Sequence, residues 1–211
     1  MAVRNLETSD DIIVGISGAS GMPYAADFLR AAFDAGLRLH VIVSPRALAV
    51  IHNEMGLTFA DAGRFDPAAF CGREDMSADA CGRMQIYDPL DFTAPPASGS
   101  FRTRGMAIIP CSMQSVGALA SGHTENLLLR AADCQLKEGR KLVLAPRETP
   151  LSLIHLENLT RLARAGAIIL PAMPAYYYHP RSIADHEHFL TTKLCDQFGI
   201  EAPAPVRWRP A

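Results

Sequence analysis

The sequence predicts an α/β fold with one doubly wound, mostly parallel sheet flanked by helices. Short apolar strands alternate with amphipathic helices along most of the chain, and strands in that order pair in parallel. With 211 residues, 49% of them hydrophobic, the chain can bury a sizeable core. We therefore expect residues 1–211 to form a single domain that ends in a C-terminal arm at about 201–211.

The first half of the chain begins with two repeats of strand and helix. Strands are predicted at Asp11–Ser17 and Leu39–Ser44, where apolar runs end at small residues. A helical spacing of apolar residues follows each strand, at Tyr24–Ala35 and Arg46–Met55. Residues 58–90 have little periodicity and carry scattered acids and glycines, so we expect short helices there, without core strands or chemistry.

The second half continues the alternation after a loop at 94–100. Its predicted elements are three strands and two helices, at Met106–Pro110, Glu125–Lys137, Lys141–Ala145, Ser152–Ala165 and Ala167–Leu170. Ligands of such sheets bind beyond the carboxyl ends of the strands. We therefore expect the residues after separate strands to converge at one edge, among them Ser20, Ser44, Ser112 and Arg147.

A turn of small residues after the first strand predicts a phosphate-binding loop. Glycines stand at positions 15, 18 and 21, and backbone N–H groups at the start of the next helix can approach an anion. A dinucleotide fingerprint would need glycine where this chain has Ser17 and Ser20, and no lysine follows as in a P-loop. A mononucleotide such as FMN fits better, although a turn that uses glycine only for close packing is equally compatible with this motif alone.

Composition and charge narrow the classes of function. The formal net charge is -2, which gives no electrostatic footprint for nucleic acid or an anionic membrane. No apolar run reaches the length of a membrane span and no signal peptide is evident, so we expect a cytoplasmic protein. The five cysteines include no C-x-x-C, and His186 and His188 point to different faces of a helix, so neither disulfides nor a metal site is predicted.

Two further segments could carry chemistry. Arg147 and Glu148 directly follow a predicted strand, where an arginine can clamp a phosphate and a carboxylate can move a proton. The alternative is that this pair caps the next helix. Tyr176, Tyr177 and Tyr178 stand in a loop between prolines, where aromatic faces could stabilise an allylic cation. For Tyr176 and Tyr178, a contact between subunits is nearly as well supported.

Taken together, these motifs span nearly the whole chain. They include Gly15-Ile16-Ser17-Gly18-Ala19-Ser20-Gly21, Ala94-Pro95-Pro96-Ala97-Ser98-Gly99-Ser100, Pro110-Cys111-Ser112, Arg130-Ala131-Ala132-Asp133, Leu136-Lys137-Glu138, Arg147-Glu148-Thr149-Pro150, Pro174-Ala175-Tyr176-Tyr177 and Arg207-Trp208. With them the chain resembles the UbiX-type flavin prenyltransferases, which belong to the homo-oligomeric FMN-binding flavoproteins. The resemblance implies a Rossmann-like fold of the flavoprotein type.

The resemblance also implies an activity. The family joins a dimethylallyl group from dimethylallyl phosphate to reduced FMN, at N5 and C6, without a metal. Its product, prenylated FMN, serves UbiD-type decarboxylases in aromatic acid decarboxylation, as in ubiquinone biosynthesis. We therefore expect FMN as the cofactor, a UbiD-type decarboxylase as the recipient of the product, and a homo-oligomer, with trimers building a dodecamer whose active sites are shared between chains.

By position, the resemblance assigns roles to individual residues of this chain. The expected FMN contacts are Ala19, Ser20, Gly21, Ser44, Ser112, Met113, Gln114, Ser115 and Arg147. The expected prenyl-phosphate side consists of Arg130, Lys137, Glu148, Tyr177 and Lys193. The expected catalytic residues are Ser20, Glu54, Glu148, Tyr177 and Trp208, with Trp208 on the C-terminal arm.

The chain departs from the family pattern at three places. Lys193 stands where the family usually has an arginine for the substrate phosphate, Ser44 is followed by Pro45-Arg46 rather than by a lysine and a small residue, and Tyr178 replaces a histidine.

Two other functions stay open. FMN-dependent decarboxylases of cysteinyl substrates share the fold, although their asparagine-containing motif and active-site histidine are not apparent, and a non-catalytic FMN carrier or assembly subunit of a decarboxylase would need the same pocket.

Overall fold

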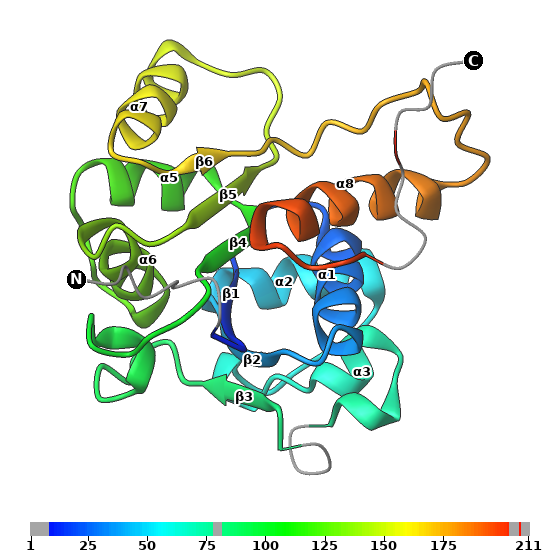
Figure 1. Cartoon of the computed structure of the whole chain (residues 1–211), viewed down its shortest axis with the longest axis horizontal. Coiled ribbons are helices and arrows are strands. Elements are labelled where there is room, and N and C mark those ends of the chain that lie inside the picture. The colour runs from blue at the N-terminus through cyan, green and yellow to red at the C-terminus, as the bar shows by residue number, and fades with distance from the viewer. Residues whose placement is uncertain (1–8, 78–81, 203–206, 208–211) are drawn as a thin grey trace, which may run out of the picture.

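The computed structural model describes residues 9–77, 82–202 and 207. They contain a six-stranded sheet in the order β3-β2-β1-β4-β5-β6, and all neighbouring strands pair in parallel (Figure 1). The strands are β1 Asp11–Ile16, β2 Arg38–Val43, β3 Met84–Tyr87, β4 Met106–Cys111, β5 Leu142–Pro146 and β6 Ile168–Ile169. The predicted α/β fold is therefore confirmed, and the sheet is parallel throughout these residues.

Helices cover both faces of the sheet (Figure 1). One face packs against α1 Met22–Asp34, α2 Pro45–Met55, α3 Pro67–Cys71 and α8 Ile183–Phe198. The other face packs against α5 Met113–Ala120, α6 Leu127–Lys137 and α7 Leu153–Arg164. Short 3₁₀ helices occur at Ala62–Arg64, Glu74–Met76 and Pro95–Ala97. None of these helices, within the part of the chain that the structure describes, is both long and apolar enough to cross a membrane.

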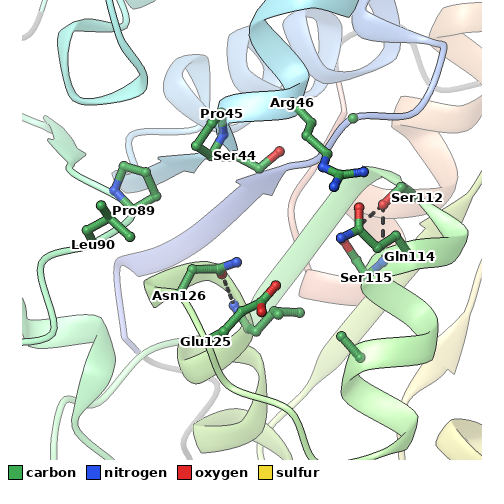
Figure 2. A pocket seen from close by; sticks show the side chains of 13 residues that line it. Ser44, Pro45, Arg46, Pro89, Leu90, Ser112, Gln114, Ser115, Glu125 and Asn126 are labelled. Carbon is green, nitrogen blue, oxygen red and sulfur yellow. Dashed lines mark hydrogen bonds between the residues drawn. The ribbon is translucent and has the colours of Figure 1, made fainter.

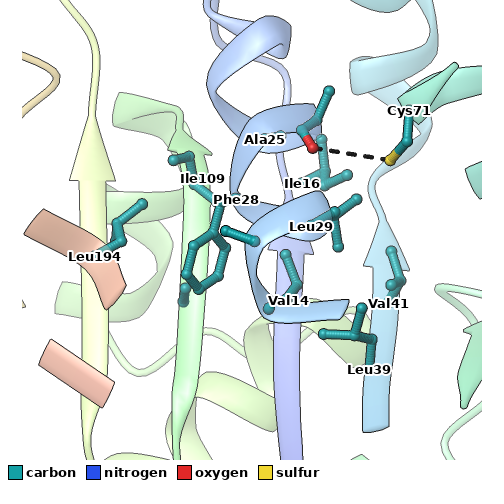
Figure 3. Close-up of a cluster of buried hydrophobic side chains, with 14 of the residues drawn as sticks. Val14, Ile16, Ala25, Phe28, Leu29, Leu39, Val41, Cys71, Ile109 and Leu194 are labelled. Carbon is teal, nitrogen blue, oxygen red and sulfur yellow. Dashed lines mark hydrogen bonds between the residues drawn. The ribbon is translucent and has the colours of Figure 1, made fainter. Parts of the chain in front are cut away.

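The strands are buried on both faces, which explains why they read as nearly continuous apolar runs. Val14, Ile16 and Val41 pack under α1 on one face, as Figure 3 shows. Alternate residues such as Ile13 and Ile108 belong to the core on the opposite face. The rigid centre of the sheet therefore fixes where the loops beyond β1 and β4 begin.

The cysteines behave as packing residues. Cys71, Cys111, Cys134 and Cys195 are buried and free of disulfides, and Cys81 lies outside the described residues. Burial raises the pKa of Cys71, Cys111 and Cys195 to about 12, so these thiols stay protonated at neutral pH. Cys111, next to Ser112 at the carboxyl end of β4, is therefore a buried, protonated thiol.

The expectation for residues 58–90 was partly wrong. The short helices are present, but β3 at Met84–Tyr87 joins the sheet beside β2. This strand has four residues and lies at the edge of the sheet, and Gln85 is exposed, so its apolar signal is weak. Helix α5 is a second element that the apolar spacing did not indicate, because it is short and rich in small residues.

A polar network ties β3 to the centre of the sheet. The carboxylate of Asp11 on β1 accepts two hydrogen bonds from Arg38, at 2.6 and 2.8 Å, and lies 2.9 Å from Nε2 of His40. The other ring nitrogen of His40 lies 2.8 Å from the hydroxyl of Tyr87 on β3. These bonds hold the pKa of Asp11 at about 2, and burial, together with the charge of Asp11, raises the pKa of Tyr87 to about 12.

We predict that Asp11→Asn lowers the free energy of unfolding at pH 7 by about 2 kcal/mol. The reason is that the folded structure stabilises the ionised carboxylate of Asp11 and so lowers its pKa from 3.8 to about 2. Because that pKa is depressed in the folded state, the stabilisation is present above about pH 4 and is lost as the pH falls through 2. Urea unfolding of both proteins at pH 7 and pH 2.5 measures this. A stability difference that does not shrink at the lower pH would contradict the role of Asp11.

Candidate functional site

The order of the sheet places a crevice at the carboxyl ends of β1 and β4. The chain leaves β1 toward α1 on one face and leaves β4 toward α5 on the other, and ligands of doubly wound sheets bind where the connections diverge in this way. The hydroxyl of Ser17 donates to the Pro110 carbonyl at 2.9 Å and accepts from the Ser112 N–H at 2.7 Å. Ser17 is 1% exposed, so it holds the two loops together rather than binding a ligand.

A pocket of about 290 Å³ opens beside this crevice (Figure 2). Its walls come from the β1–α1 loop, the first turn of α2, the loop after β3, helix α5 and the start of α6. The lining residues are Gly18, Ser44, Pro45, Arg46, Pro89, Leu90, Ser112, Gln114, Ser115, Ala118, Glu125, Asn126 and Leu129. A concave site that combines apolar walls with a few convergent polar groups is the usual form of a small-molecule site.

The start of α2 carries the least satisfied polar groups of the pocket. Ser44 occupies the N-cap position, where a serine usually accepts a hydrogen bond from the first turn, but it makes no such bond. Its Oγ is buried and has no hydrogen-bond partner among the described residues. By contrast, Ser112 caps α5 by accepting from the Ser115 N–H at 3.2 Å. The unpartnered hydroxyl and the helix N-terminus together favour an anionic ligand.

Gly18 allows the β1–α1 loop to lie directly on α2. A Cβ atom at this position would come 2.9 Å from Cβ of Arg46 and 3.2 Å from its carbonyl carbon and oxygen. Only glycine therefore permits this approach without a shift of the backbone of α2. The glycine-rich motif predicted from the sequence thus serves close packing at Gly18, and this packing shapes one wall of the pocket.

The turn that leads into α1 is satisfied by a side chain of the protein itself. The carboxylate of Glu54 accepts hydrogen bonds from the N–H groups of Gly21, at 2.9 Å, and Met22, at 2.8 Å. Gly21 has a φ of 111°, a conformation that favours glycine. The backbone donors that the sequence suggested for a phosphate at this turn are therefore occupied by Glu54 in the structure.

The structure brings four of the expected FMN contacts together in the pocket: Ser44, Ser112, Gln114 and Ser115. Met113 lies beneath them and is 9% exposed. From the β1–α1 loop only Gly18 lines the pocket, while Ala19, Ser20 and Gly21 do not. Arg147 is exposed beyond β5, and its positive charge acts on Tyr24 of α1, whose pKa is raised mainly by burial and by Glu187.

Arg147 and Glu148 do not cap the following helix. That role belongs to Ser152, which accepts from the His155 N–H at 3.2 Å, while the His155 ring accepts from the Ser152 N–H. Glu148 is exposed and, among the residues that the structure describes, accepts only from the N–H of its neighbour Thr149, at 3.1 Å. The alternative explanation of this pair as a helix cap is thus removed, and both side chains are available at the edge beyond β5.

The tyrosine loop packs against α8. Tyr178 stacks on Phe189 with ring centroids 5.3 Å apart, and Tyr177 meets the same ring edge-on at 6.1 Å. Nζ of Lys193 lies 5.5 Å from the centroid of Phe189. The loop and α8 therefore form one aromatic wall with a cation held over it. Tyr177 is 40% exposed, so part of its ring is open to a ligand.

The remaining predicted residues lie elsewhere. Arg130 and Lys137 are on α6, which runs from the pocket toward the start of β5, so Lys137 lies at the opposite edge of the sheet from Glu148. Arg130 binds the Ala97 carbonyl at 3.1 Å, and Lys137 lies 2.5 Å from the carboxylate of Glu138. Trp208 and most of the predicted arm at 201–211 are outside the described residues.

Sequence reasoning missed part of the pocket. Pro89 and Leu90 line it because they follow β3, and Glu125 and Asn126 line it at the start of α6. The alternation of Met84 with Ile86 was the signal that could have placed the first pair. No group of three or more His, Cys, Asp and Glu residues suited to a metal ion occurs in the described ranges.

Comparisons with known proteins identify the family and agree with the fold. The sequence profile of the flavoprotein family matches residues 2–187. A flavin prenyltransferase UbiX from Methanothermobacter thermautotrophicus is 43% identical over 197 residues, which cover 93% of this chain and 94% of the relative. A dodecameric FMN-dependent UbiX-like decarboxylase from Escherichia coli O157:H7 superposes with a TM-score of 0.81 at 39% identity, covering 95% of this chain and 100% of that one.

AnUbiX (PadA1), solved in complex with FMN and dimethylallyl pyrophosphate, gives a TM-score of 0.83 at 33% identity, covering 96% of this chain and 99% of that one. The FMN-dependent cysteine decarboxylase TvaF is only 16% identical with a TM-score of 0.51, and therefore shares the fold alone. On these grounds the chain belongs to the flavoprotein family and, within it, to the UbiX-type flavin prenyltransferases.

Proposed function

We propose that this protein transfers a dimethylallyl group from dimethylallyl phosphate to N5 and C6 of reduced FMN. The observation that carries the proposal is the pocket in which Ser44, with its unpartnered hydroxyl, meets Ser112 and Ser115 at the starts of α2 and α5. Its relatives include proteins named flavin prenyltransferase UbiX and a structure with FMN and dimethylallyl pyrophosphate.

The pocket residues fit the polar part of FMN. Ser44 can donate its hydroxyl, which has no partner among the described residues, and the first turn of α2 directs backbone N–H groups and the positive end of its dipole toward the pocket. We assign Ala19, Ser20, Gly21, Met113, Gln114 and Arg147 to the same cofactor from adjoining loops. When bound and reduced, FMN supplies the nucleophile, so the protein mainly positions the reactants and stabilises charge.

The prenyl side needs cations for a phosphate leaving group and π-faces for an allylic cation. Lys193 and Tyr177 stand on the aromatic wall, whose rings can stabilise positive charge in a site with little water. Glu148, exposed and free of a capping role, is assigned as the group that moves a proton. Ser20, Glu54 and Trp208 complete the proposed catalytic set.

We further propose that the site is completed by a second copy of the chain. Lys137 and Glu148 lie at opposite edges of the sheet, and α6 with its 11 residues spans roughly 16 Å along its axis. Because both residues are assigned to one phosphate site, they must come from different chains. The single chain also exposes large apolar side chains such as Leu153, Ile154 and Ile183, as expected of subunits that pack together.

The product would be consumed by a different enzyme. We assign a UbiD-type decarboxylase as the recipient of prenylated FMN, because a modified flavin has use only in a second protein. A cytoplasmic location of this protein is part of the same proposal.

The activity is tested by anaerobic incubation with FMN, a chemical reductant and dimethylallyl phosphate, followed by mass spectrometry of the released flavin. We expect a flavin heavier by one C5H8 unit. If FMN binds but stays unmodified with both the phosphate and the pyrophosphate donor, the transferase assignment is wrong and a non-catalytic carrier is favoured. Flavin reduction by a cysteinyl substrate would instead favour the decarboxylase alternative.

Glu148→Gln should lower the rate of prenyl transfer by about 100-fold or more, since the amide keeps the shape of the side chain but cannot take up a proton. Binding of FMN should be unchanged, because Glu148 does not line the pocket. Single-turnover kinetics at saturating FMN separate the two effects. Turnover at the wild-type rate would remove Glu148 from the mechanism.

The shared site predicts complementation between two inactive variants. Lys137→Ala and Glu148→Gln, each inactive alone, should regain about one quarter of wild-type activity when co-expressed in equal amounts, because a quarter of the sites then combine two intact chains. As a control, Lys137→Ala with Arg130→Ala should restore none, since both residues lie on α6 of one chain. Absence of recovery in the first mixture would place both residues in a site within a single chain.

A further inference from the structure

Arg46 lines the pocket, although neither the motifs nor the family resemblance assigned it a role. It is the second residue of α2 and is exposed. Figure 2 shows its guanidinium extending from α2 into the pocket, toward the wall that Ser112 and Gln114 form. No carboxylate of the described residues pairs with it, unlike Arg38 or Arg73. The pocket therefore contains a cation that the folded chain does not neutralise.

The backbone at the start of α2, like the Arg46 side chain, also offers a hydrogen-bond donor to a ligand. Pro45, the first residue of α2, has no N–H, and the Ala47 N–H donates to the Ser44 carbonyl at 2.9 Å. The Arg46 N–H belongs to the first turn, where a helix has no acceptor of its own. With the unpartnered Ser44 hydroxyl, one turn of helix thus offers three donors of different kinds to a single ligand. The N-termini of α1 and α5 differ, because Glu54 and Ser112 already occupy their donors.

The polarity of the pocket orients the ligand. Figure 2 shows Glu125 across the pocket from Arg46 and beside Asn126, with the apolar side chains of Pro89 and Leu90 on another side. A phosphate monoester carries a charge of about −1.5 to −2 at neutral pH, so it is attracted to the Arg46 end and repelled from Glu125. Arginine can also bind two phosphate oxygens at once.

Resting on the proposed function, we infer that Arg46 and the start of α2 bind the phosphate group of FMN and make the pocket select FMN over riboflavin. The pair Pro45-Arg46, which replaces a lysine and a small residue of the family pattern, thus moves the cation by one position along the helix. The apolar side chains of Pro89 and Leu90 are left for the uncharged part of the flavin.

The test compares dissociation constants of oxidised FMN and riboflavin, measured by flavin fluorescence in the intact protein and in Arg46→Gln. We expect Arg46→Gln to weaken FMN binding by about 10-fold, the loss of one charge-assisted contact, and to leave riboflavin binding unchanged. Arg46→Lys should fall between the two, because lysine keeps the charge but not the paired contact. Arg164→Gln, which removes an exposed charge on α7 away from this pocket, is the matched control and should leave both constants unchanged.

Retained riboflavin binding shows that Arg46→Gln is folded. An equal loss for both flavins, or a loss for neither, would overturn the assignment of Arg46. A raised KM for dimethylallyl phosphate with unchanged FMN affinity would overturn it too, because the phosphate at α2 would then be that of the prenyl donor. If the wild-type protein binds no FMN, the proposed function fails as well. If the wild type prenylates FMN but Arg46→Gln leaves the preference for FMN over riboflavin unchanged, only the inference about Arg46 fails.

Discussion

Helices α1, α2 and α5 begin at the same edge of the sheet, and each begins with N–H groups that the helix itself cannot satisfy. The groups that accept hydrogen bonds from these N–H donors determine where a ligand can bind. The start of α1 is closed by the carboxylate of Glu54 and that of α5 by the hydroxyl of Ser112. At α2 the hydroxyl of Ser44 stays unpartnered. The chain thus fixes two of the three loops with its own atoms and keeps the third for a ligand.

The same edge of the sheet is the basis for the proposal that two chains complete the site. The Ser17 bridge holds the loops after β1 and β4 in place, and the pocket forms beside them within a single chain. The α6 residues assigned to the prenyl phosphate cannot follow, because α6 runs antiparallel to the strands and carries Lys137 to the far edge. On this proposal one chain provides the flavin pocket, whereas prenyl transfer depends on how copies of the chain assemble.

The central strands were predicted well from the sequence. Because they are buried on both faces, each is a continuous run of apolar residues that can be recognised without knowing which elements pack against it. The prediction failed at β3, which has four residues, lies at the edge of the sheet and buries only Met84 fully, so that the hydrogen bond between His40 and Tyr87 adds to a small apolar contact. The pocket was predicted in part. Ser44 and Ser112 follow strands and could be placed by topology, but the occupation of the α1 start by Glu54 joins residues 33 positions apart and leaves no local pattern.

Charge distribution links the pocket to the proposed reaction. A chain with a net charge of -2 must concentrate cations to hold two phosphate groups. Arg38 is paired with Asp11 and Arg73 with Asp34. Of the cations assigned to the prenyl phosphate, Arg130 is paired with Asp133 and Lys137 with Glu138. Arg46 and Arg147 have no carboxylate partner among the described residues, and Lys193 lies over an aromatic ring instead. Because an unpaired cation costs the folded chain self-repulsion that a bound anion relieves, binding of FMN and of the prenyl donor should each stabilise the protein.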